Sequence, residues 1–301
     1  MPCTIESLTP ILLIALYYCF TILPCFILLH HSLSVQAFLL LQAHFGGVEL
    51  PISDYINDLK SVLDQAMRIL NAMVDIAADE GLLDLALGCM NLAQCVSSGR
   101  YFDDSPFLQL PGVTADHVAI LKNKNIRTLQ EMRSSSGRLG SLLRMKPGAV
   151  KGIQAGLGKL PVIDLTWTVT EDKGEGKAEG EEGGEERGEE RGEEGGIRVS
   201  CDADCTVNIE ITVGGRRGGG GGPARKGGKK EIIGWWLVLG VAGEVLALKR
   251  ITLPPGTTRR ESLSFGADEE PGESTMELHL VSDCTSGLDQ QHSIVLDVRQ
   301  P

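Results

Sequence analysis

The second half of the chain shows the alternation of apolar and polar residues that is typical of β-strands. Residues 205–213 carry Val207, Ile209, Ile211 and Val213 at every second position, which places them on one face of a strand. Six other segments have strand patterns: 160–170, 234–241, 244–253, 261–265, 275–283 and 292–298. Seven strands with Gly, Pro or acidic turns between them predict an antiparallel sandwich of immunoglobulin or fibronectin type over residues 160–301.

The first half has apolar residues at steps of three and four, which predicts helices. A helical bundle is expected over 34–105, with Ser53 or Asp54 as the N-cap of its long helix and Gly81 as its left-handed C-terminal residue. Shorter helices are expected over 106–159, and Thr114 and Thr128 cap two of them. The predicted fold class is therefore α+β and multidomain: a helical bundle, a small helix-loop-helix unit and a β-sandwich.

Residues 1–33 form a separate apolar segment. No charged side chain occurs between Glu6 and Glu49, and residues 11–29 are almost entirely apolar. Such a run is long enough to span ~30 Å of hydrocarbon, but the first base of the chain is Lys60, so no flanking charge sets an orientation. Two interpretations stay open: a transmembrane helix, or translated non-coding sequence from an inaccurate gene model.

Charge is distributed unevenly along the chain. The net charge of −12 argues against nucleic-acid binding by bulk charge alone. Residues 171–196 hold 12 acids and 4 bases, whereas residues 214–230 hold 6 bases, 9 glycines and no acid. Neither segment can bury enough apolar area to offset its ordering entropy, so both are predicted to be disordered insertions in the sandwich. The basic insertion is interpreted as inert, with weak RNA contact or pairing with the acidic insertion as alternatives.

Motifs of known catalytic chemistry are absent from the sequence. It contains no phosphate-binding loop, no acidic ATPase box, no nucleophile elbow and no His-Glu-x-x-His pair. Cys201 and Cys205 lack the second Cys/His pair that a zinc site needs. We therefore expect no catalytic residue, no cofactor and no metal site. The eight scattered cysteines and the lack of a glycosylation sequon favour a reducing compartment with buried thiols.

The helix-loop-helix unit is the most basic part of the chain that is expected to be ordered. A basic helical surface is typical of nucleic-acid contact, with a solvated surface as the alternative. The candidate contact residues are Lys122, Lys124, Arg127, Arg144, Lys146 and Lys151.

Several segments resemble one known family. They are Ala37–Phe45, Ser61–Gly81, Ala86–Val96, Gly234–Gly240, Leu246–Leu253 and Val281–Val298. Their sequences are similar to the homology domain named after the Sec-sixty-three translocon subunit, in the form that Ski-two-like tandem-cassette helicases carry. The resemblance implies the same order of bundle, helix-loop-helix unit and sandwich. It also implies a module that braces the RecA-like motor, lines part of the nucleic-acid path and offers its sandwich to partner proteins.

The chain departs from those helicases because it carries no motor motifs, so we expect no ATP hydrolysis by it alone. The predicted function is a non-catalytic scaffold of a helicase in RNA surveillance, ribosome rescue or splicing. Its expected partners are helicase motor domains in cis or in trans, proteins on the sandwich, and weakly bound single-stranded RNA or DNA, in the cytoplasm or nucleus. The alternative is a membrane-anchored component of protein translocation, held in the endoplasmic reticulum membrane through residues 11–29.

Overall fold

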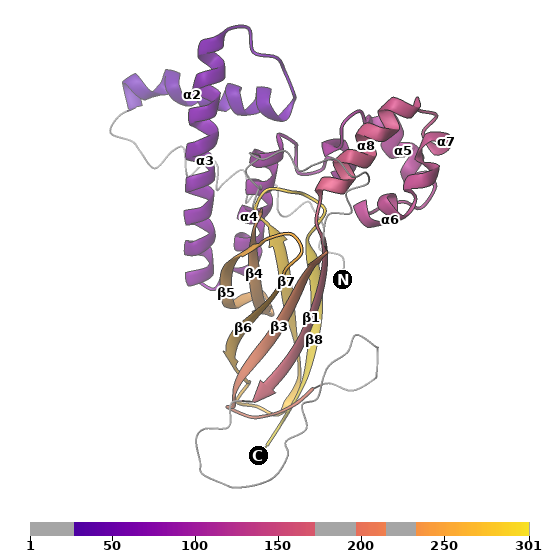
Figure 1. Ribbon diagram of the computed structural model, residues 1–301. Helices are drawn as coiled ribbons and strands as arrows, with labels where there is room; N and C mark the ends of the chain where they lie inside the picture. Colours follow the sequence, from indigo (N-terminus) through magenta and orange to yellow (C-terminus); the bar gives the residue numbers. More distant parts are fainter. Residues whose placement is uncertain (1–26, 172–196, 215–232, 301) are drawn as a thin grey trace. The chain divides into compact units, whose positions relative to one another are not determined.

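The computed structural model describes residues 27–171, 197–214 and 233–300, with side chains from residue 34 onward. The chain divides into two compact units between Asp104 and Ser105, and each is described by itself (Figure 1). The segments predicted as disordered, 171–196 and 214–230, lie outside the described residues except for Glu171 and Gly214, which end strands.

The described residues of the first unit form three helices: α2 (Ile27–Phe45), α3 (Ser53–Asp79) and α4 (Leu83–Ser98). Helices α3 and α4 pack as an antiparallel pair, and Gly81 between them has a φ of 71°, as predicted. The predicted N-cap was wrong: Ile52 caps α3 in an extended conformation with no side-chain hydrogen bond. Asp54 instead lies in the first turn of the helix, where its charge complements the helix dipole.

The membrane interpretation concerned residues 11–29, most of which lie outside the described residues. Among the described residues, no helix combines the length and the apolar character needed to cross a bilayer.

The second unit begins with a small helical subdomain, residues 105–160, which we call the hairpin subdomain. Its elements are η3 (Pro106–Gln109), α5 (Ala115–Asn123), α6 (Leu129–Ser134), η4 (Ser136–Arg138), α7 (Leu139–Leu142) and α8 (Pro147–Lys159). Thr114 and Thr128 are the N-caps of α5 and α6, as predicted. Phe107, Leu121, Met132 and Ile153 are almost fully buried and form the centre of a core that belongs to this subdomain.

The remainder of the second unit is a sandwich of two sheets. Its strands are β1 (Val162–Glu171), β2 (Ile197–Ser200), β3 (Asp204–Gly214), β4 (Ile233–Val241), β5 (Glu244–Leu253), β6 (Thr258–Gly266), β7 (Gly272–Ser282) and β8 (Gln290–Arg299). One sheet has the order β1-β3-β6 and the other β2-β8-β7-β4-β5. The described residues thus form eight strands rather than seven, and β2 pairs with β8 in parallel, so the second sheet is mixed rather than purely antiparallel.

The sandwich core follows from the patterns of its strands. In β3 the buried residues alternate with exposed or partly exposed ones, as the period-two pattern predicts. In β4 seven consecutive residues are buried, and Trp235, Leu237 and Leu239 belong to the core between the sheets. Trp236 and Val238, which point to the opposite face of the strand, are buried as well.

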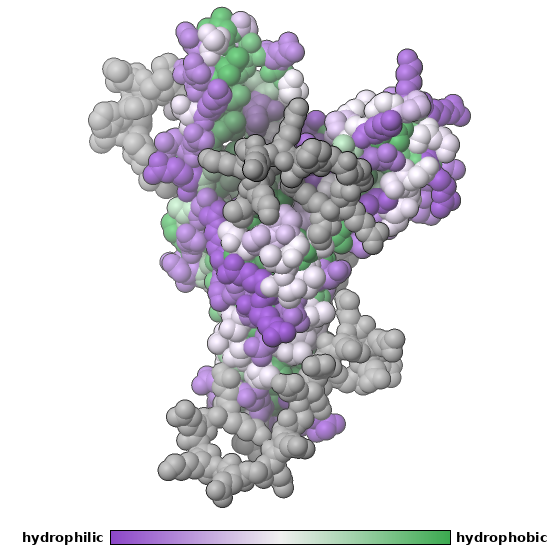
Figure 2. Space-filling model, in the orientation of Figure 1, coloured by the Kyte–Doolittle hydropathy of each residue, from purple (hydrophilic) through white to green (hydrophobic). Residues whose placement is uncertain are grey.

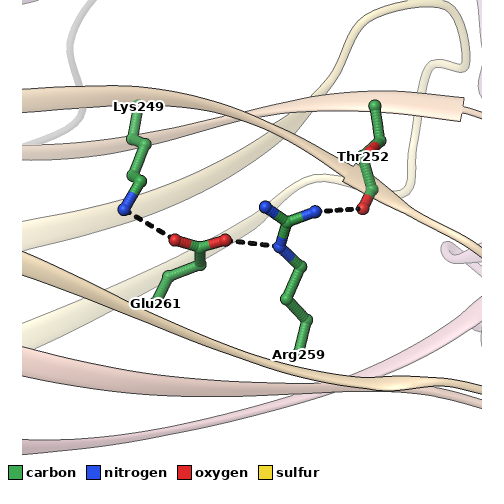
Figure 3. A network of polar contacts seen from close by, with 4 residues as sticks. All are labelled: Lys249, Thr252, Arg259 and Glu261. Atoms are coloured by element: carbon green, nitrogen blue, oxygen red, sulfur yellow. Dashed lines mark hydrogen bonds and ion pairs between the residues drawn. The ribbon is translucent and has the colours of Figure 1, made fainter.

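A charged network joins the two sheets where β5 meets β6 (Figure 3). Glu261 of β6, whose side chain is 7% exposed, pairs with Lys249 of β5 at 2.7 Å and with Arg259. Arg259 Nη1 also donates a hydrogen bond to the carbonyl of Thr252 at 3.0 Å. Burial acts to raise the pKa of Glu261, but the hydrogen bonds from Lys249 and Arg259 outweigh it and hold the pKa below its ordinary value. β5 and β6 are the edge strands of their sheets, and inward-facing charges on edge strands disfavour pairing with another chain.

We expect Glu261→Gln to lower the free energy of unfolding at pH 7 by about 1–2 kcal/mol, because two charge-assisted hydrogen bonds are lost while both cations stay partly solvated. A carboxylate with a lowered folded pKa stabilises the fold above its unfolded pKa, and this stability is lost as the pH falls through the folded pKa. Urea denaturation should therefore show a difference at pH 7 that shrinks at low pH. Glu210→Gln is the matched control, because its pair with Arg260 is exposed and is worth under about 0.5 kcal/mol. Equal losses of unfolding free energy in the two variants would contradict the stabilising role of the Glu261 network.

Candidate nucleic-acid interface

The hairpin subdomain has a charge opposite to that of the whole chain. Residues 106–159 carry nine bases and only two acids, Asp116 and Glu131, whereas the chain as a whole has a net charge of −12. An excess of seven positive charges on so small a subdomain makes it the strongest positive feature among the described residues.

Two turns with the same backbone geometry organise this subdomain. The first joins α5 to α6 and the second joins α7 to α8. Each has a non-glycine residue at positive φ, Asn125 at 58° and Arg144 at 52°. In each, the next residue closes the turn with a bond to a carbonyl five residues earlier, Ile126 N to Leu121 O at 3.0 Å and Met145 N to Gly140 O at 3.1 Å. Such bonds are typical of the Schellman ending of a helix, and the two turns repeat at an offset of 19 residues.

The candidate bases gather around these turns. Lys122 and Lys124 precede the positive-φ residue of the first turn, and Arg127 follows it. Arg144 and Lys146 occupy the second turn, and Lys151 lies in α8 after it. All six side chains are exposed. Within the described part of the chain, none of them forms an ion pair. Figure 2 shows hydrophilic side chains projecting from this subdomain, so the bases are accessible to a polyanion.

Two other charged residues of the subdomain have structural roles that sequence reasoning missed. Arg133 is partly buried, and its Nη2 donates hydrogen bonds to the carbonyls of Leu157 at 2.6 Å and Leu160 at 2.8 Å. Glu131 accepts hydrogen bonds from the backbone N–H groups of Arg127 and Thr128, which hold its pKa below the ordinary value. The role of Glu131 has a sequence signal, because Thr128-x-x-Glu131 is a capping box at the start of α6. No motif marks the role of Arg133, because its contacts span more than 20 residues.

A hollow of about 570 Å³ lies beside the first turn and is lined by Asn125, Ile126, Thr128, Gln130, Glu131, Ser134 and Ser135. Its only charged lining residue is the ionised Glu131, which repels phosphate. The candidate interface is therefore the exposed basic turns rather than this hollow.

The topology separates the two charged insertions. Strand β1 runs from Val162, paired with Gly214, to Glu171, paired with Cys205. The residues flanking the basic insertion thus lie at the end of the sandwich where the hairpin subdomain joins β1. Glu171, which precedes the acidic insertion, lies at the other end of β1, roughly 30 Å away along the nine residue steps from Gly214 to Cys205. The point where the acidic insertion leaves β1 is therefore remote from the junction with the hairpin subdomain.

The described residues hold no group of His, Cys, Asp or Glu that could bind a metal ion. Burial raises the pKa of Cys95 and of Cys284 to about 11, so both thiols are protonated at neutral pH and are poor nucleophiles.

Comparisons with known proteins agree with this architecture. The family model described as the Sec63 Brl domain matches residues 28–295. The human protein named activating signal cointegrator 1 complex subunit 3 is 33% identical over 301 aligned residues, which cover 88% of this chain and 13% of that protein. The Arabidopsis thaliana protein named DExH-box ATP-dependent RNA helicase DExH14 is 32% identical over 86% of this chain and 11% of its own length. The chain thus spans about an eighth of the length of the curated relatives it matches.

Proposed function

Because the chain belongs to the Sec63 Brl domain family, in the form that its helicase relatives carry, we propose that it is a non-catalytic brace for a helicase motor. In this proposal the first unit docks on the motor, which belongs to the same longer protein or to a separate one. The hairpin subdomain contacts the nucleic acid, and the sandwich binds partner proteins. The site of action is the cytoplasm or nucleus.

One observation carries the docking role. Among the described residues, all twelve large apolar side chains that are exposed lie between Val35 and Phe102, in the first unit. They are Val35, Phe38, Leu39, Val48, Ile52, Tyr55, Ile56, Ile69, Ile76, Leu82, Tyr101 and Phe102. Apolar residues accordingly reach the surface of this unit in Figure 2. A concentration of exposed apolar side chains marks an interaction surface, and a brace of this kind needs one.

The apolar stripe of helix α3 is wider than the surface that its own packing buries. Its buried residues Leu70, Val74 and Ala77 lie on one side of the helix. Ile69 and Ile76 are 47% and 61% exposed, and their seven-residue spacing puts them on one line along the helix. This second line is available to a partner after α4 has packed on α3.

The exposed bases of the hairpin subdomain support the nucleic-acid role. Two or three phosphate contacts in an isolated acidic chain give weak binding, no tighter than ~10⁻⁴ M at physiological salt. Tethering to a motor that already holds the strand would raise the effective concentration of these contacts. The expected ligand is single-stranded RNA or DNA, without sequence preference.

We expect Lys122→Glu, Lys124→Glu and Arg127→Glu together to abolish low-salt binding of single-stranded RNA, measured by fluorescence anisotropy. The binding of the parent protein should fade toward physiological salt, since each contact releases counterions. The charge-matched control is Lys60→Glu with Arg68→Glu and Arg198→Glu, three exposed bases outside the subdomain, which should reduce binding much less. If the first variant bound as well as the parent, the interface would lie elsewhere.

We also expect no ATP hydrolysis by the purified chain, with or without RNA, because the sequence has no phosphate-binding loop and no acidic box. A coupled phosphate-release assay checks this expectation. ATP hydrolysis by the purified chain that disappeared when one of its own residues was substituted would contradict this expectation.

A further inference from the structure

The loop between β7 and β8, residues 283–289, is held firmly to the sandwich. Ser282 is fully buried; its N–H donates to Asp289 Oδ1 at 2.8 Å, and its hydroxyl oxygen accepts from the N–H of Thr285 at 3.1 Å. The N–H of Asp283 donates to the carbonyl of Gly234 at 3.0 Å. The base of the loop is therefore fixed on β4 and closed by the bond between Ser282 and Asp289.

The tip of the same loop contacts the entrance of the hairpin subdomain. Gln109 Nε2 donates a hydrogen bond to the carbonyl of Ser286 at 2.9 Å. Gly287 has a φ of 80°, and a Cβ added there would lie 2.6 Å from Pro106 Cβ. Leu288 packs against both the sandwich core and the core of the hairpin subdomain. The loop thus forms a non-covalent contact between the two parts of this unit.

The covalent connection between these parts is also braced. The chain enters the sandwich at Leu160–Val162. On the side of the hairpin subdomain, Arg133 donates a hydrogen bond to the carbonyl of Leu160. From the sandwich side, Gln290 Nε2 donates to the carbonyl of Ile163 at 2.8 Å. A body attached through one short linker can swivel about it, whereas a second contact away from the linker removes that freedom.

We propose that the 283–289 loop is a lock that holds the hairpin subdomain and the sandwich together as one rigid body, with Gly287 as its critical residue. Only a residue without a side chain fits against Pro106 at a positive φ. The lock gives the basic turns a fixed direction relative to the sandwich. A partner that displaced the loop would release them, so the loop is a point where binding on the sandwich can regulate the hairpin subdomain. The lock does not depend on nucleic-acid binding by the basic turns.

The test compares Gly287→Ala with Gly256→Ala in the full chain. Gly256 has nearly the same φ, 78°, but a Cβ added there would meet nothing within 4 Å, so it controls for backbone strain without the clash. Residual dipolar couplings of the weakly aligned, deuterated protein report whether residues 115–159 and the sandwich strands share one alignment tensor. We expect a common tensor for the parent and for Gly256→Ala. For Gly287→Ala we expect two different tensors, while the amide shifts of the Met132 and Ile153 region remain those of a folded core.

A second variant keeps the proposal falsifiable if Gly287→Ala unfolds the unit. Gln109→Ala with Leu288→Ala removes the hydrogen bond and the shared packing and adds no clash; it should also abolish the common tensor. The proposal is overturned if the parent itself needs two tensors. It is equally overturned if the folded variants keep a single one.

Discussion

Ile69→Asp with Ile76→Asp should weaken binding of the chain to a helicase motor by about 100-fold or more, because buried anchors at the centre of an interface contribute about 2–4 kcal/mol each. Both side chains are exposed on the first unit, so the double variant should fold as the parent does. The motor region of the Arabidopsis thaliana relative named as an ATP-dependent RNA helicase, expressed without the segment that matches this chain, is a suitable partner. Binding is measured by isothermal titration calorimetry.

The matched control introduces the same charges on another face of α3. Asn57 and Ser61 are also neutral and exposed, and they lie roughly 70–110° around the helix from the line of Ile69 and Ile76. Asn57→Asp with Ser61→Asp should change the affinity less than tenfold, since a charge at the edge of an interface has little effect. Equal losses in the two double variants would show that charge, rather than the apolar line, explains the effect.

Trp235→Ala is expected to have the largest effect on folding. Trp235 is fully buried between the two sheets, and replacing a buried tryptophan with alanine costs about 3–5 kcal/mol in lost packing and an unfilled cavity. Because a domain is stable by only about 5–15 kcal/mol, the sandwich should unfold at a much lower urea concentration. The control is Thr166→Ala, an exposed position on β1, where a change within about 0.5 kcal/mol is expected. A loss below 1 kcal/mol for Trp235→Ala would contradict the assignment of the core.

The architecture could be predicted from the sequence because its elements have clear periods. The α3–α4 pair and most of the predicted strands carry regular apolar patterns, and β4 is a continuous apolar run. The Thr128 cap follows from local chemistry. Strand β2 could not be predicted, since four residues directly after an acidic run show no period and its parallel pairing with β8 is a tertiary contact.

The candidate site was predictable in its charge but not in its arrangement. The six bases follow from composition, whereas the repeat of two turns depends on the positive φ of Asn125 and Arg144. Asn often adopts this conformation, but Arg does so rarely, so the sequence gives no signal for the second turn. The role of Arg133 depends on carbonyls brought near it by folding. The line of Ile69 and Ile76 could not be separated from the core stripe of α3, because residues that pack within a fold and residues that dock on a partner have the same apolar pattern.

Titration of residues 34–301 into that motor region tests the central claim most directly, since it asks whether the module binds a motor at all. The account predicts a saturable one-to-one complex with a negative heat-capacity change, the mark of buried apolar surface. It also predicts protection from hydrogen exchange over α2 and α3 in the complex. A folded chain that gave no binding heat at any temperature, and the same exchange with and without the motor, would contradict the account.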